Sequence, residues 1–228
     1  MTHFSIERRQ ADVLRIGARG RRVRRGSLLE RGAASLELAI IMPLMLMVLL
    51  GFLDIYNFMR TQSTVEHTAF MLADSLSMMT TVFNDTGTTN ANALGSVWNA
   101  ANLIAQPLAL STNGGVIITS VCDSPLCTST TPNTATTAGT PKIWWQASAP
   151  WNTSKAVTKE TTSTILPTYW PFRSGDSAIV VEVFYVYDPF PLVRGFWPSA
   201  PGKTTLYKRV YARPRTNVPL PLKDQSLE

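Results

Sequence analysis

The feature that most constrains this chain is a long apolar run near its N-terminus. Residues 36–53 are eighteen consecutive residues with one charge, Glu37. Together with residues 33–35 they reach the roughly 20 residues that a helix needs to span a bilayer core. We therefore predict a transmembrane helix over residues 33–54. A buried core helix is the alternative, because it can be equally apolar.

The charges on the two sides of this run differ sharply. Residues 1–32 contain nine arginines and three acidic residues, whereas the rest of the chain has twelve basic and twelve acidic residues. The positive-inside rule then predicts that residues 1–32 form a basic cytoplasmic leader and that the C-terminal part crosses the membrane. A nucleic-acid-binding arm is a second interpretation of the arginines, which would make DNA binding salt-sensitive.

The apolar run differs from a cleaved secretory signal. Such signals have a shorter apolar region of roughly 7–15 residues, followed by a small-x-small cleavage site. Here the run continues directly into Asp54, Ile55 and Tyr56. We expect the apolar segment to remain in the mature protein.

A helical pattern continues beyond the run, and we predict an amphipathic periplasmic helix over residues 55–85. Apolar residues recur at three- and four-residue steps, with Gln62 between them, and no proline or glycine interrupts residues 52–83. The expected stripe consists of Ile55, Phe58, Met59, Gln62, Val65, Ala69, Leu72, Ala73, Leu76 and Met79. A turn cluster at residues 84–90 would end the helix.

Residues 86–228 have the pattern of a small α+β head. Leu94, Val97, Trp98 and Ala101 predict a short second helix. The strand-like segments are 115–121, 142–148, 177–187 and 204–213. Apolar residues occupy both faces of the third, which predicts a central strand. The predicted fold class is therefore α+β: a long N-terminal helix packed on a small antiparallel sheet.

The small residues Gly32 and Ala33 and the charged residue Glu37 stand at the start of the apolar run. A carboxylate inside a membrane segment is costly, by roughly 2.5–3.5 kcal/mol at a central position, so a partner for Glu37 is the default expectation. If the chain is cut between Gly32 and Ala33, Glu37 becomes the fifth residue of the mature chain. Its carboxylate can then meet the new N-terminal ammonium of a neighbouring subunit.

These residues resemble the start of TadE-like pilins or pseudopilins of the tight-adherence (Tad, type IVc) pilus system. The similarity rests on the spacing of Gly32, Glu37, Pro43, Gly51 and Asp54. Residues 180–190 and 207–215 are also similar to the ends of TadE/TadG-type pilus assembly proteins.

The resemblance implies a minor pilin or pseudopilin that takes part in assembling or priming the pilus. A prepilin peptidase would cut between Gly32 and Ala33, and Glu37 and Pro43 would serve subunit assembly. Implied partners are the bacterial inner membrane, the peptidase, other pilins and the Tad assembly platform, but neither nucleic acid nor a small-molecule substrate. The N-terminus would be cytoplasmic and the head periplasmic, or extracellular within the pilus.

The remaining polar residues predict no catalysis, cofactor or metal. Cys122 and Cys127 are the only cysteines, and export to an oxidising compartment favours a disulfide between them. Two unpaired thiols are the alternative. Asp176, Glu182 and Asp188 lack histidine or cysteine partners, which favours solvated or paired surface carboxylates.

Two further interpretations concern the head. Five tryptophans suggest either a sugar- or surface-binding platform or large rings that fill a small core: Trp144, Trp145, Trp151, Trp170 and Trp197. The platform would suit the alternative function, an unprocessed single-pass protein that anchors a periplasmic binding head in the membrane.

Overall fold

The computed structural model describes residues 28–124, 126–151, 156–161 and 165–224, with side chains from Ser35 onward. Most of the predicted basic leader, residues 1–27, lies outside the described residues. Residues 1–49 and 50–228 form two compact units. One helix, α2 (Leu28–Met78), runs through the boundary between the units. It begins five residues before the predicted start at Ala33.

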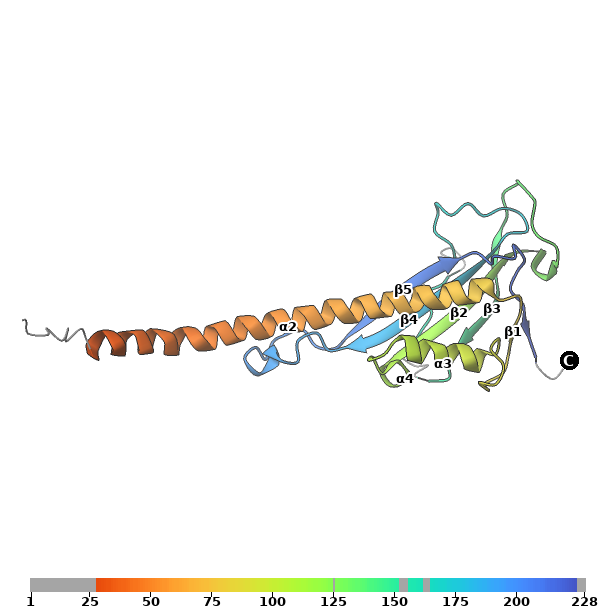
Figure 1. Ribbon diagram of the computed structural model, residues 1–228. Helices are drawn as coiled ribbons and strands as arrows, with labels where there is room; N and C mark the ends of the chain where they lie inside the picture. The colour runs from red at the N-terminus through yellow and green to blue at the C-terminus, as the bar shows by residue number, and fades with distance from the viewer. Residues whose placement is uncertain (1–27, 125, 152–155, 162–164, 225–228) are drawn as a thin grey trace, which may run out of the picture. The chain divides into compact units, whose positions relative to one another are not determined.

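The second unit contains the last half of α2 and a four-stranded antiparallel sheet (Figure 1). The strands are β2 (Gly114–Asp123), β3 (Pro141–Ser148), β4 (Ser177–Tyr187) and β5 (Thr204–Ala212). Their order is β3-β2-β4-β5, so β4 is a central strand as its two apolar faces predicted. The α+β fold class is confirmed.

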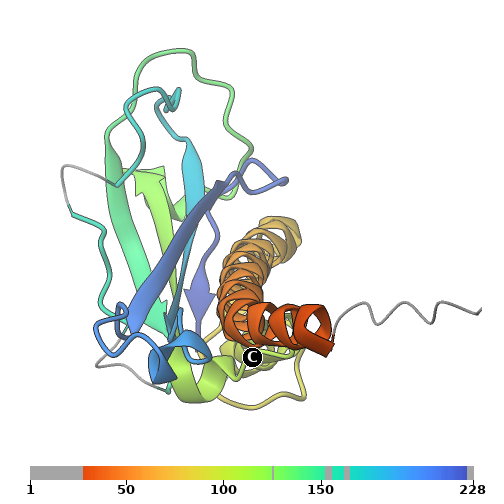
Figure 2. The ribbon, with the colours of Figure 1, turned by 90° about the vertical axis from the view of Figure 1, so that its left-hand side faces the viewer.

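The second half of α2 and a short helix, α3 (Leu94–Ile104), lie on one face of the sheet (Figures 1 and 2). Buried α2 side chains recur at three- and four-residue steps, which places them on a single stripe. They meet alternate residues of β4, because side chains on a strand alternate between its faces. The main core contains Val65, Ala69, Leu72, Leu76, Trp98, Ile179, Val181 and Val183.

The α2 stripe differs from the predicted one in its first two turns. Ile55 and Met59 are exposed, at 47% and 63%, and the buried positions are instead taken by Asp54 and Thr61. The hydroxyl of Thr61 donates to the carbonyl of Asn57 at 2.8 Å, which satisfies it inside the helix. The helical period therefore holds, but polar residues occupy the start of its buried face.

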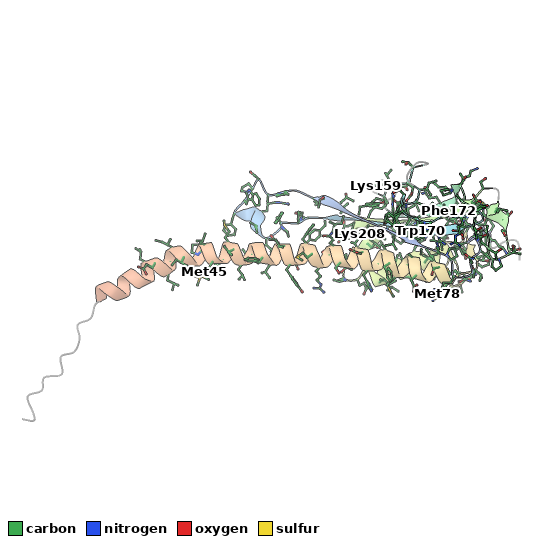
Figure 3. The ribbon with its side chains drawn as sticks, turned by 90° about the horizontal axis from the view of Figure 1, so that it is seen from above. Met45, Met78, Lys159, Trp170, Phe172 and Lys208 are labelled. Atoms are coloured by element: carbon green, nitrogen blue, oxygen red, sulfur yellow. A yellow bond between two sulfur atoms is a disulfide. The ribbon has the colours of Figure 1, made fainter. Side chains whose placement is uncertain are left out.

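Two ion pairs attach α2 to the rest of the second unit. Lys208 of β5 lies 2.8 Å from Glu66, and Arg215 lies 2.7 Å from Asp74 (Lys208 is labelled in Figure 3). Both pairs are partly exposed, so each contributes at most about 1 kcal/mol to stability. The buried apolar side chains of α2 therefore contribute most of the binding between this helix and the sheet.

The helix α2 ends at Met78, earlier than its periodicity predicted. Val82 and Phe83 form a short strand, β1, which pairs in parallel with β6 (Leu222–Lys223). A one-turn helix, α4 (Leu110–Asn113), precedes β2. Two 3-10 turns, η1 (Leu126–Thr128) and η2 (Val193–Gly195), lie in the loops.

Candidate functional site

The first turns of α2 contain the predicted processing site. Gly32 and Ala33 both lie within the helix that begins at Leu28. Glu37 follows Ala33 by four residues, about one helical turn, and is exposed. The carboxylate of Glu37 therefore lies about one turn beyond the position at which cleavage would create a new N-terminus.

The apolar run has the exposure expected of a segment that meets lipid or other helices. One stretch among the described residues, Ser35–Met78 of α2, is long and apolar enough to cross a membrane, and only 6% of its most apolar window is buried. Met45, for example, is 66% exposed (Figure 3). A core helix of a soluble domain would be mostly buried, so this exposure favours a membrane-spanning helix over a buried core helix.

Two helix-weakening residues interrupt this exposed surface. Pro43 lies inside α2 and has no N–H to donate to the carbonyl of Ala39. A Cβ added at Gly51 would meet no atom within 4 Å, so no close packing within the chain requires glycine there.

Asp54 connects α2 to the loop after β4. Its carboxylate is fully buried and accepts hydrogen bonds from the backbone N–H groups of Val193, at 3.1 Å, and Leu192, at 3.4 Å. These donors lie at the start of η2, where backbone N–H groups have no partner within the turn. Asp54 thus caps η2 from the neighbouring helix.

The comparisons with known proteins agree with this arrangement. Residues 32–74 match the family model described as TadE-like protein. The matched segment begins at Gly32 and contains Glu37, Pro43, Gly51 and Asp54. Over these residues the chain is similar to TadE-like proteins. No curated protein and no solved structure matches it.

The match and the exposed apolar helix support a single-pass membrane protein associated with the Tad pilus. TadE-like proteins are pilin-like structural or assembly proteins and are not known as enzymes. Within the described residues, no group of three or more histidine, cysteine or acidic side chains could hold a metal ion.

A disulfide closes one loop of the head. Cys122, at the end of β2, is bonded to Cys127 in η1, with their Cα atoms 5.2 Å apart. Asp123, beside the first cysteine, accepts from the backbone N–H of Thr140 at 2.6 Å and of Gly175 at 2.9 Å. Together these contacts tie the loop after β2 to two other loops.

A buried ionic cluster covers the sheet face opposite α2. The guanidinium of Arg209 on β5 lies 3.0 Å from Glu160 and 3.1 Å from Glu182. Glu182 also accepts from the hydroxyls of Thr158, at 2.5 Å, and Tyr207, at 2.7 Å. One arginine therefore serves two carboxylates whose side chains are both fully buried.

The pKa of Glu160 is raised in this cluster, in which one guanidinium serves two buried carboxylates. Burial raises the pKa of Glu160 to about 7; Arg209 opposes this shift and the neighbouring Glu182 adds to it. Lys159, labelled in Figure 3, lies 4.1 Å from the centre of the Tyr207 ring. The segment 156–160 is thus attached to the sheet by a cluster whose charge depends on pH.

The structure corrects the expectation for the acidic residues of β4 and its ends. Asp176 and Glu182 are paired but buried, at 4% and 0% exposure, and are not surface carboxylates. Asp188 forms a two-pronged pair with Arg194 at 2.6 and 2.7 Å. Sequence alone did not reveal the burial, because Arg209 and Tyr207 lie on a different strand.

The five tryptophans occupy separate places. Trp151 packs edge-on against Trp98 with ring centres 6.4 Å apart, and Trp170 packs against Tyr211 at 6.0 Å. Trp145 donates its indole N–H to the carbonyl of Leu220 at 2.7 Å. Trp197 is 48% exposed and Trp144 lines a separate cavity, so the five rings do not form one platform.

Proposed function

We propose that this chain is a minor pilin or pseudopilin, processed after Gly32 by a prepilin peptidase, that takes part in assembling or priming a Tad pilus. The observation that carries the proposal is the spacing of Gly32, Ala33, Glu37 and Pro43 at the start of an exposed apolar helix. Cleavage creates an ammonium at Ala33. The Glu37 carboxylate of an adjacent subunit neutralises it in the membrane, where an unpaired charge is costly.

The proposed location is the bacterial inner membrane, with the leader in the cytoplasm and the head in the periplasm or outside the cell. The arginines of residues 1–32 support this orientation through the positive-inside rule. The Cys122–Cys127 disulfide also supports it, since disulfides persist in oxidising compartments. The partners are the peptidase, other pilins and the Tad assembly platform.

Two substitutions separate processing from assembly. Gly32→Ala should slow cleavage, because alanine favours the helix and glycine more readily adopts the extended backbone that a protease cleft binds. Glu37→Ala should leave cleavage intact and impair pilus assembly. Glu66→Ala, which removes an exposed carboxylate further along the same helix, is the matched control and should affect neither. Normal piliation in the Glu37→Ala strain would overturn the pairing role.

An unprocessed membrane-anchored protein with a periplasmic binding head is a second candidate, which the cavity at Trp144 favours. Gene neighbourhood separates the two candidates. A secretion ATPase, a secretin and other short proteins with the Gly-x-x-x-x-Glu pattern nearby would favour the pilus, whereas their absence would favour the anchored binding protein.

A further inference from the structure

One cavity of the second unit lies beyond the C-terminal end of α2. It has a volume of about 540 Å³, within the range of small-molecule sites. Its lining comes from the segment after α2, the loop after β2, strand β3 and the C-terminal segment. The lining residues are Thr80, Thr81, Thr128, Ser129, Thr130, Trp144, Thr216, Val218, Pro219, Pro221 and Lys223.

The cavity lies far from the point at which the apolar run enters this unit. The part of α2 that belongs to the unit runs from Leu50 to Met78, which corresponds to about 40 Å at ~1.5 Å per residue. Met78, labelled in Figure 3, is followed almost directly by the cavity residues Thr80 and Thr81. Helix-to-helix packing along the apolar run would therefore leave this end of the unit accessible.

The walls of the cavity are fixed by bonds between segments that are distant in the sequence. The indole N–H of Trp145 donates to the carbonyl of Leu220. The backbone N–H of Val82 donates to the carbonyl of Pro221 at 3.0 Å. The N–H of Asn84 donates to the carbonyl of Lys223 at 2.7 Å. The Cys122–Cys127 disulfide closes the loop that continues into residues 128–130. A ligand would meet a site that is already formed, which reduces the entropy cost of binding.

The cavity combines an apolar surface with polar groups that have no partner in the described part of the chain. Trp144, Val218 and two prolines supply the apolar surface. Unlike Trp145, Trp144 makes no hydrogen bond with its indole N–H to the described residues, and neither do the threonine hydroxyls of the lining. Lys223 likewise forms no ion pair with the described residues, and the lining contains no carboxylate.

These groups restrict the chemistry of a ligand. A purely apolar ligand would cover the threonine hydroxyls without bonding them, which is unfavourable. A cationic ligand would meet an ammonium and no carboxylate. A saccharide presents an apolar ring face for the indole and hydroxyls that both donate and accept, and a carboxylate on it would pair with Lys223.

We propose that this cavity binds a short acidic saccharide, with a sugar ring stacked on Trp144 and its carboxylate at Lys223. The saccharide is bound and not transformed. The site goes beyond the role in pilus assembly and does not depend on cleavage at Gly32.

Titration calorimetry on the full-length protein in detergent tests the proposal. The probes are oligogalacturonate, a hyaluronan tetrasaccharide and sialyllactose, with maltotetraose and lactose as neutral counterparts. We expect at least one acidic probe to bind more tightly than the neutral sugars. Trp144→Ala should weaken that binding at least tenfold, and Lys223→Gln should weaken it several-fold and abolish the preference for acidic over neutral sugars.

Two matched controls lie outside the cavity: Trp197→Ala, an exposed ring elsewhere, and Lys142→Gln on the same strand as Trp144. Both should bind like the unmodified protein. If Trp144→Ala fails to fold, Trp144→Phe replaces it. This variant keeps a stacking ring but loses the N–H, and should bind measurably more weakly than the unmodified protein, by a factor of about two to ten.

Three results would overturn the proposal. The first is that no acidic saccharide of the panel binds. The second is that binding is equally strong in a folded variant without Trp144. The third is that a proline-rich peptide binds at this cavity and the saccharides do not. None of these results bears on processing at Gly32, so they leave the proposed pilin function to its own test.

Discussion

Asp54 illustrates how a charged residue can be part of the buried face of a helix. Its carboxylate replaces water with two backbone N–H donors, from Leu192 and Val193. A buried carboxylate without such donors would be strongly unfavourable. Asp54 belongs to the TadE-like pattern in the sequence, but its partners are not predictable from that pattern, because η2 is more than a hundred residues away in the chain.

Asp54→Ala should therefore destabilise the head. The substitution leaves two backbone N–H groups without an acceptor, at a cost of about 1–3 kcal/mol in the free energy of unfolding. Thermal unfolding of the detergent-solubilised protein measures this loss. Asn57→Ala, an exposed position one turn further along α2, is the control and should change stability little. Equal transitions for the two variants would contradict the capping role.

Glu160 makes the stability of the head depend on pH. Its pKa is raised in the folded state, to about 7 from an ordinary value of 4.5, so the folded protein binds the proton more tightly than the unfolded chain. This contribution is fully present below about pH 4.5 and is lost as the pH rises through about 7. The free energy of unfolding should fall by about 1–3 kcal/mol between pH 5 and pH 8.

Glu160→Gln checks the assignment, because glutamine keeps the shape of the side chain and does not titrate. Denaturant unfolding between pH 5 and pH 8 should show a flatter stability profile for this variant. Glu66→Gln, whose side chain is 61% exposed, should retain the unmodified slope. A slope that survives in Glu160→Gln would assign the pH dependence to another group.

Among the secondary-structure elements, those with strong local patterns were predicted well. The bounds of β4 agree at both ends, and those of β2, β3 and β5 agree to within two residues. Alternating β-branched and aromatic residues specify these strands locally. The pair β1–β6 was missed because each strand has two residues and its partner lies near the opposite end of the head.

The sequence does not predict the cavity at Trp144, although Trp144 is one of the five tryptophans suggested for a binding platform. Its walls come from four segments that meet only in the folded head. Likewise, apolar periodicity predicts Ile55 and Met59 on the first turns of the buried α2 face, because that pattern does not include a buried aspartate or threonine.

The disulfide between Cys122 and Cys127 should raise the free energy of unfolding. Closing a loop of about six residues should stabilise the fold by about 2 kcal/mol through the unfolded chain. Replacing Cys122 and Cys127 by serine should lower the free energy of unfolding by about this amount and make the thermal transition insensitive to reductant. A transition of the unmodified protein that reductant leaves unchanged would contradict this expectation.

At the scale of the whole molecule, charge and apolar surface are divided between the parts of the chain. The excess positive charge lies within residues 1–32, and the exposed apolar surface follows it in α2. The head buries two carboxylates around one arginine and presents a preformed cavity. In the proposed account, cleavage removes the charge and creates the ammonium that Glu37 needs.

The position of the mature N-terminus tests this account most directly. Mass spectrometry of the protein isolated from its host, in the membrane and in assembled pili, identifies the first residue. The account predicts that the assembled form begins at Ala33. An assembled form that retains the intact leader, residues 1–32, would contradict it.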